Sequence, residues 1–215
     1  MLVAEEVRYH LNMGFPMAFQ SSIIAIGSIS VTVALNQLGP LAIASYGAAS
    51  KIEQIVILVL MSFGIAMATY VGQNFGAAQF DRIRQGVRQM TFLSVGVALV
   101  SGVILALTGA QVVTFFAEGS QGLEMAHYGQ VFWLLALLFI YRYTLQGLGD
   151  SLIPTIAGIM ELAMRMSAAL ILSNYLGFVG PAIASPLAWL GACVPLLLAY
   201  HYHKHHLQER FNQKL

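Results

Sequence analysis

The residues most able to do chemistry are four charged side chains inside long apolar stretches of the sequence. They are Lys51, Glu53, Glu161 and Arg165. Glu161 and Arg165 are four residues apart, which places them on one helix face in the order that favours an ion pair. Lys51 and Glu53 are two residues apart, about 200° around a helix, so each needs water or another helix to supply its partner.

Placing a charge near the centre of a bilayer costs at least about 2.5–3.5 kcal/mol, so such residues usually face a bundle interior or a wet cavity. Along their helices, Glu53 lies about 15 Å from the start of its apolar stretch at residue 43, and Arg165 lies about 16 Å from the start of its stretch at residue 154, so both are expected near the midplane. We therefore expect Glu53 and Lys51 to meet the Glu161–Arg165 pair across a bundle. These residues could couple ion movement or bind a charged substrate, or they could form a structural ion-pair network. Glu53 is the preferred proton site, because burial disfavours its charged form.

Two further polar residues are candidates for ion coupling or substrate binding, Gln20 and Asn36. Gln20 begins a polar series in the first apolar stretch, continued by Ser21, Ser22, Ser28, Ser30 and Thr32. The series could line a cavity, or it could make hydrogen bonds between helices, worth about 0.6 kcal/mol each.

Catalytic and metal-binding patterns are weak. The one cysteine, Cys193, lies in an apolar run and suits a small core residue better than a nucleophile. His201, His203, His205 and His206 could bind a metal, but no cysteine or carboxylate completes the set. We expect no enzyme activity and no bound cofactor or metal, the transported coupling ion aside.

Composition points to the membrane. Of 215 residues, 58% are hydrophobic and 9% charged, whereas a soluble domain has about 25% charged residues. The apolar runs are about 20 residues long, enough to cross about 30 Å of hydrocarbon as a helix. We expect an all-α, polytopic six-helix bundle. Its spans are about 14–35, 43–71, 90–113, 125–145, 154–172 and 181–200, within a lobe at 13–203 between a lead-in at 1–12 and a tail at 204–215.

Lys and Arg predict the orientation. Eight fall on one side of the expected spans: Arg8, Arg82, Arg84, Arg88, Arg142, Lys204, Arg210 and Lys214. The alternate loops, 36–40, 114–123 and 173–180, contain none. Because cytoplasmic loops carry the excess of Lys and Arg, both termini are expected in the cytosol, with the chain multi-pass in the plasma (inner) membrane. With a net charge of +1, nothing favours nucleic acid as a partner.

Four stretches resemble the multidrug and toxic compound extrusion (MATE) family, within the larger group of multidrug, oligosaccharidyl-lipid and polysaccharide exporters. They are GFPMAFQSSIIAIGS (14–28), LGPLAIASYGAASKIEQI (38–55), SFGIAMATYVGQNFGAAQFDRIRQG (62–86) and LQGLGDSLIPTIAGIMELAMR (145–165). Family members have about twelve spans in two six-helix lobes, and these residues resemble the C-terminal lobe. The resemblance implies export of cationic or amphipathic compounds, coupled to protons or sodium, by alternating access.

The resemblance also leaves points open. One branch of the family has a functional carboxylate in its seventh span, but the corresponding stretch here, 14–35, has none. The implied partners are the lipid bilayer, a small amphipathic or cationic substrate, and a missing N-terminal lobe or a second copy of the chain. A lipid-linked oligosaccharide flippase of the same superfamily and a non-transporting accessory protein or remnant are the alternatives.

Overall fold

The computed structural model describes residues 4–116 and 131–214, and all of its regular elements there are helices. In chain order they are α1 (Ala4–Leu38), α2 (Pro40–Gly76), α3 (Phe80–Phe116), α5 (Phe132–Gly147), α6 (Leu152–Met166), the π-helix η2 (Ser167–Leu172), α7 (Ser173–Leu176), α8 (Val179–His205) and α9 (Leu207–Lys214). The expected all-α class is confirmed.

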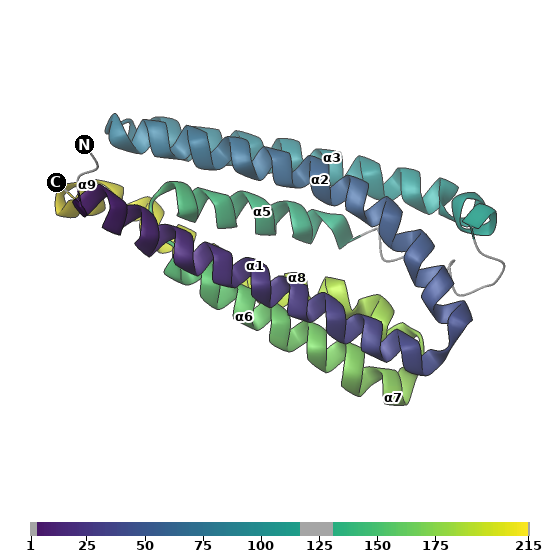
Figure 1. Ribbon diagram of the computed structural model, residues 1–215. Helices are drawn as coiled ribbons and strands as arrows, with labels where there is room; N and C mark the ends of the chain where they lie inside the picture. Colours follow the sequence, from purple (N-terminus) through teal and green to yellow (C-terminus); the bar gives the residue numbers. More distant parts are fainter. Residues whose placement is uncertain (1–3, 117–130, 215) are drawn as a thin grey trace.

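The helices form an elongated bundle with α5 at its centre (Figure 1). On one side α2 and α3 run side by side, and on the other α1, α6 and α8 pack together (Figure 1). α5 contacts α2, α3 and α8, so it connects the two layers. The beginning of α1 and the end of α9 lie at the same end of the bundle (Figure 1).

Turn chemistry sets the helix ends. Gly39 separates α1 from α2 with φ at 97°, a conformation that suits glycine, and Pro40 opens α2 where a missing N–H is harmless. Between α5 and α6, Asp150 accepts hydrogen bonds at Oδ1 from the backbone N–H groups of Leu152 and Ile153, at 3.1 and 3.3 Å. Asp150 therefore satisfies two otherwise unpaired donors of the first turn of α6.

Small residues allow close helix contacts. A Cβ atom added at Gly147 of α5 would lie 2.6 Å from the carbonyl oxygen of Ala68 in α2. A Cβ at Gly72 would lie 3.6 Å from the Gly147 carbonyl oxygen, an ordinary contact. In membranes such small residues replace the hydrophobic effect as the means of helix association, since they let backbones approach. The contact of α2 with α5 therefore depends on Gly147 more than on Gly72.

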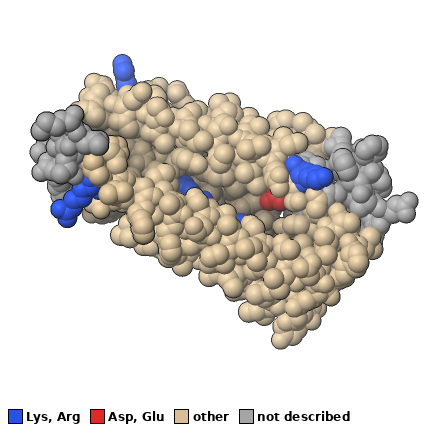
Figure 2. Space-filling view, viewed as in Figure 1, with Lys and Arg blue, Asp and Glu red and all other residues tan. Residues whose placement is uncertain are grey.

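The described helices are long and apolar enough to cross a membrane five times. These segments are His10–Leu38, Pro40–Gly76, Phe80–Leu107, Leu152–Leu176 and Val179–His205. The fourth expected span, 125–145, lies partly in 117–130, outside the described residues, and its described part is α5. Much of the surface is apolar and uncharged, and on the face in Figure 2 the few charged atoms lie near the ends or within the central hollow.

Several local expectations need correction. The first span is expected to begin at about residue 14, but α1 begins at Ala4, so Pro16 lies well inside the helix. The expected turn over 173–180 contains the short helix α7, which η2 links to α6. In the expected tail, α9 packs against the bundle, where Leu207 is buried and Phe211 contacts Phe75 edge to face. These departures lie at the helix ends, where tertiary packing decides the boundaries.

Candidate functional site

A polar cavity of about 340 Å³ lies inside the bundle. Its walls come from α1, α2, α5, α6 and α8, while α3 contributes no residue. Four charged residues line it, and its uncharged polar residues are Ser28, Thr32, Tyr46, Ser50, Gln54 and Ser185. Such a polar interior in a chain of long apolar helices marks the place where water, ions or polar substrate groups can be accommodated.

The cavity contains a buried cluster of three charges. The Glu161 carboxylate accepts from Arg142 at Oε2 (2.7 Å) and from Arg165 at Oε1 (2.8 Å). The Glu161 and Arg142 side chains are each only 6% exposed, and that of Arg165 is 12% exposed. One carboxylate thus bridges two guanidinium groups, and the cluster keeps one excess positive charge.

Glu53 is the fourth charged residue of the cavity. It lies on α2, opposite the helices that carry the cluster, and it makes no ion pair with a described residue. Arg165 lines the same cavity as Glu53. With Glu53 ionised, the four side chains are neutral in sum, and protonating it would leave one positive charge in the cavity. Glu53 is therefore the one carboxylate among the described residues of this cavity that no arginine pairs with.

Packing against α1 leaves space for the Arg165 side chain to reach the cavity. Its side chain passes beside Gly27 of α1, where an added Cβ would lie 3.0 Å from the Arg165 Cδ. Glu161 lies one turn earlier on α6, so the expected pairing of these two residues is confirmed. Immediately after Arg165 the helix widens into η2, an unusual geometry that often accompanies functional sites.

The other candidate residues lie outside the cavity lining. Lys51 is exposed on α2 and does not line the cavity, so the expectation that it meets the Glu161–Arg165 pair is not confirmed. Asn36 is exposed near the end of α1. Gln20 is buried beside Gly158 of α6, and its Oε1 accepts a hydrogen bond of 3.3 Å from Gln146 of α5. Gln20 thus connects three helices. Of the polar series on α1, Ser28 and Thr32 reach the cavity.

Arg142 was counted among the loop charges on the sequence, and this placement is wrong. It lies within α5, is 5% exposed, and donates to Glu161. Only five residues separate it from Gly147, the last residue of α5. That is about 7.5 Å along the axis, a distance over which an arginine can either reach the interface or turn inward. The Glu161 carboxylate on α6 turns the Arg142 side chain inward, and the spacing of residues along α5 does not reveal this partner.

The histidine-rich segment forms no metal cluster within the described residues. His203 instead contacts the Asp150 carboxylate, with 2.9 Å between Nε2 and Oδ2. His206 stacks on Tyr202, with ring centroids 4.4 Å apart. The segment therefore ties the end of α8 to the α5–α6 turn.

Fold and site together describe a polytopic helical membrane protein with a charged cavity. The sequence matches the family model described as MatE over residues 16–179. The chain belongs to the MatE family.

Curated relatives agree. The chain is 28% identical over 202 residues to Probable multidrug resistance protein YoeA of Bacillus subtilis, covering 90% of this chain and 43% of that protein. It is 27% identical over 151 residues to Probable multidrug resistance protein NorM of Halalkalibacterium halodurans, covering 70% of this chain and 30% of that one. The chain thus spans less than half the length of these relatives.

Solved structures share the fold. One described as MATE in the bent conformation superposes with a TM-score of 0.84 at 17% identity, covering 99% of this chain and 48% of the other. A transporter of the MOP superfamily from Pyrococcus furiosus, described as having a binding pocket of reverse polarity, superposes with a TM-score of 0.73 at 19% identity. It covers 90% of this chain and 44% of that one.

Proposed function

We propose that this chain is part of a cation-coupled antiporter that exports small amphipathic or cationic compounds by alternating access. The single observation that carries the coupling role is Glu53, a carboxylate without an ion-pair partner among the described residues that lines an internal cavity opposite a buried Arg–Glu–Arg cluster. Ionisable groups placed in this way within membrane proteins typically belong to ion or proton pathways. Membership of the MatE family and relatives described as probable multidrug resistance proteins support the transport role.

The roles within the cavity divide between the cluster and Glu53. Glu161 is saturated by two arginines, so it holds them in place and has little capacity to exchange a cation. Arg165 lines the cavity together with Glu53, and its positive charge would compete with a cation for the Glu53 carboxylate, which keeps the cation exchangeable. The Arg142 Nε–H has no acceptor among the described residues although it is buried. Such a donor normally binds water or a ligand group, which supports a hydrated cavity.

The function can be tested in source cells that lack the chain and are loaded with ethidium, a fluorescent cation. We expect these cells to retain the dye and the restored chain to export it. The Glu53→Gln variant should export ethidium at least about tenfold more slowly than the unmodified chain, because a neutral amide cannot take part in cation exchange. Glu209→Gln, a matched change of an exposed carboxylate on α9, should export normally. The amount of each variant in the membrane is measured in parallel.

Two results would contradict the proposal in different ways. If cells lacking the chain export ethidium normally, this chain does not take part in export of that class of compound. If Glu53→Gln exports as well as Glu209→Gln, export is real but Glu53 is not the coupling group. An accessory role instead predicts that charge changes in the cavity lower the amount of protein without slowing export per molecule.

A further inference from the structure

A second hollow lies on the outside of the bundle, at the end where most of the charged residues gather. It has a volume of about 850 Å³ and lies between the start of α3, α5 and the end of α8. Three basic residues line it, Arg84, Arg88 and Lys204, together with Tyr141 and Tyr200. None of these residues lines the internal cavity. The hollow is therefore a separate site, on the side of the molecule formed by the outer helix α3.

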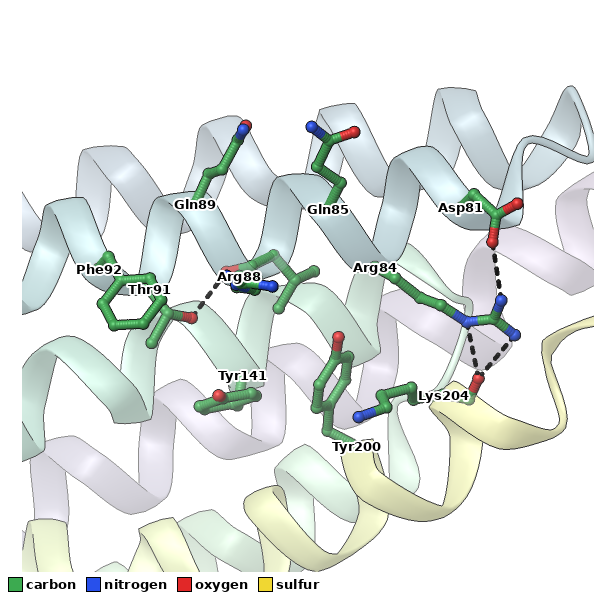
Figure 3. A pocket seen from close by; sticks show the side chains of 11 residues that line it. Asp81, Arg84, Gln85, Arg88, Gln89, Thr91, Phe92, Tyr141, Tyr200 and Lys204 are labelled. Atoms are coloured by element: carbon green, nitrogen blue, oxygen red, sulfur yellow. Dashed lines mark hydrogen bonds and ion pairs between the residues drawn. The ribbon is translucent and has the colours of Figure 1, made fainter.

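The basic residues of this hollow do not all have partners (Figure 3). Arg84 pairs with Asp81 at 2.9 Å and donates to the Lys204 carbonyl oxygen at 3.2 and 3.3 Å. Arg88 and the Lys204 ammonium make no ion pair within 4–116 and 131–214. The Lys204 ammonium lies beside the Tyr200 side chain (Figure 3), and Arg88 lines the same hollow. Two cations and a phenol O–H that line one hollow suit a phosphate group.

An apolar trough continues from this hollow along α3. It has a volume of about 380 Å³ and is lined by Phe92, Leu93, Gly96, Val97, Val100 and Ser101. Phe92 lines both hollows and is 70% exposed. From Phe92 to Ser101 the trough extends about 13 Å along the helix axis, the scale of a lipid acyl chain. A free phosphate ion has no apolar part, so it would not occupy this trough.

We propose that these two hollows together bind one anionic phospholipid, its phosphate between Arg88, Lys204 and Tyr200 and an acyl chain along α3. Basic pockets between transmembrane helices on the cytoplasmic side are suited to anionic headgroups, and tyrosines are enriched at the membrane interface. The proposal rests on the membrane role proposed above, but it does not depend on which compound is exported or which ion drives export.

The test is lipid binding to the purified full chain in detergent, measured by native mass spectrometry with phosphatidylglycerol and with zwitterionic phosphatidylcholine. We expect phosphatidylglycerol to bind more tightly. Arg88→Gln combined with Lys204→Gln should weaken it by about thirtyfold, since each interfacial cation contributes about fivefold. Arg82→Gln is the matched control, because Arg82 is an exposed arginine of α3 near Arg88 in sequence yet lines neither hollow. The single change Arg88→Gln serves if the double variant does not fold.

Three results would overturn the proposal. The first is equal loss in Arg82→Gln, which would mean that general surface charge attracts the lipid. The second is full competition by inorganic phosphate, which would mean that the hollow binds the free ion. The third is unchanged binding of phosphatidylglycerol to the Phe92→Ala variant, which would mean that no acyl chain lies in the trough. Because bound lipid and not export is measured, failure here leaves the ethidium experiment unaffected, and the converse also holds.

Discussion

Two arginine–carboxylate clusters in this molecule have similar local geometry and very different surroundings. Glu161 and Arg165 are paired across one helical turn at 2.8 Å with side chains 6% and 12% exposed. Asp81 and Arg84 are paired across one turn at 2.9 Å, with side chains 96% and 44% exposed. The bond lengths are nearly equal, so length says little about what each pair contributes. Solvation decides how much each pair contributes to stability, because water screens the outer pair and cannot replace a partner of the inner one.

The sharpest test of this comparison is Glu161→Gln. It leaves two buried arginines near each other without a carboxylate, and we expect a loss of about 3–5 kcal/mol, the usual effect of breaking a buried ion pair. The measurement is the apparent Tm of the detergent-purified chain, with Glu209→Gln as the exposed control. Equal Tm values in the two variants would show that water reaches the cluster freely, and the contrast between the two clusters would then be wrong.

A triple change separates structure from function at the same site. Arg142→Met, Glu161→Leu and Arg165→Met together replace the cluster with apolar groups of similar size, a replacement that is often neutral for stability. We expect the triple variant to recover most of the Tm lost in Glu161→Gln. If it also exports ethidium normally, the cluster has no role in transport and the structural alternative holds. Loss of export at a wild-type Tm would support the functional reading.

Much of this arrangement was predictable from the sequence, for physical reasons. The Glu161–Arg165 pair follows from helical spacing alone, and the Asp150 cap follows from an aspartate before an apolar run. The all-α class follows from apolar runs long enough to cross a bilayer. These are all local properties of the chain, and local properties can be read along it.

Contacts between helices were harder to predict. Arg142 approaches Glu161 from 19 residues away, and its inward turn depends on how α5 lies against α6. Gly27 has no chemistry of its own, yet the space beside it lets the Arg165 side chain pass. The π-helix η2 also has no local signature in its sequence, three small residues followed by three aliphatic ones. Each of these features comes from packing that the sequence of a single helix does not specify.

The position of α5 provides the next test, since it carries Arg142 to the inner cluster. Gly147→Ala would place a Cβ 2.6 Å from the Ala68 carbonyl oxygen, forcing α5 away from α2. We expect a loss of about 1–3 kcal/mol, as for other overpacked contacts. Gly72→Ala is the control, with 3.6 Å of room, and it should be neutral or stabilise α2 by up to about 1 kcal/mol. Losses of the same size in both variants would contradict the close contact at Gly147.

Changes at Asp150, in the turn between α5 and α6, provide a further test. Its side chain is 11% exposed, it caps α6, and it contacts His203 at the end of α8. Asp150→Ala should cost about 1 kcal/mol through the lost cap. Asp150→Asn keeps an oxygen for the cap and should cost less. If the two variants have the same Tm, the contact with His203 contributes more than the cap does.

The smallest effect on stability is expected for Asp81→Asn, which breaks the outer pair. Its contribution should be below about 1 kcal/mol and should shrink further in high salt, since exposed charges are screened beyond about 10 Å at 0.1 M salt. Among the described residues that line the outer hollow, Asp81 is the one acidic side chain, so the same change removes that negative charge. Phosphatidylglycerol should therefore bind more tightly to this variant, by up to about fivefold. A variant that loses little stability but gains lipid affinity would show that the outer cluster contributes to binding at the membrane surface, whereas the inner cluster, where Glu161→Gln is expected to cost about 3–5 kcal/mol, contributes to stability. A large fall in Tm for Asp81→Asn would contradict this, because the outer pair would then contribute to the fold as the inner one does.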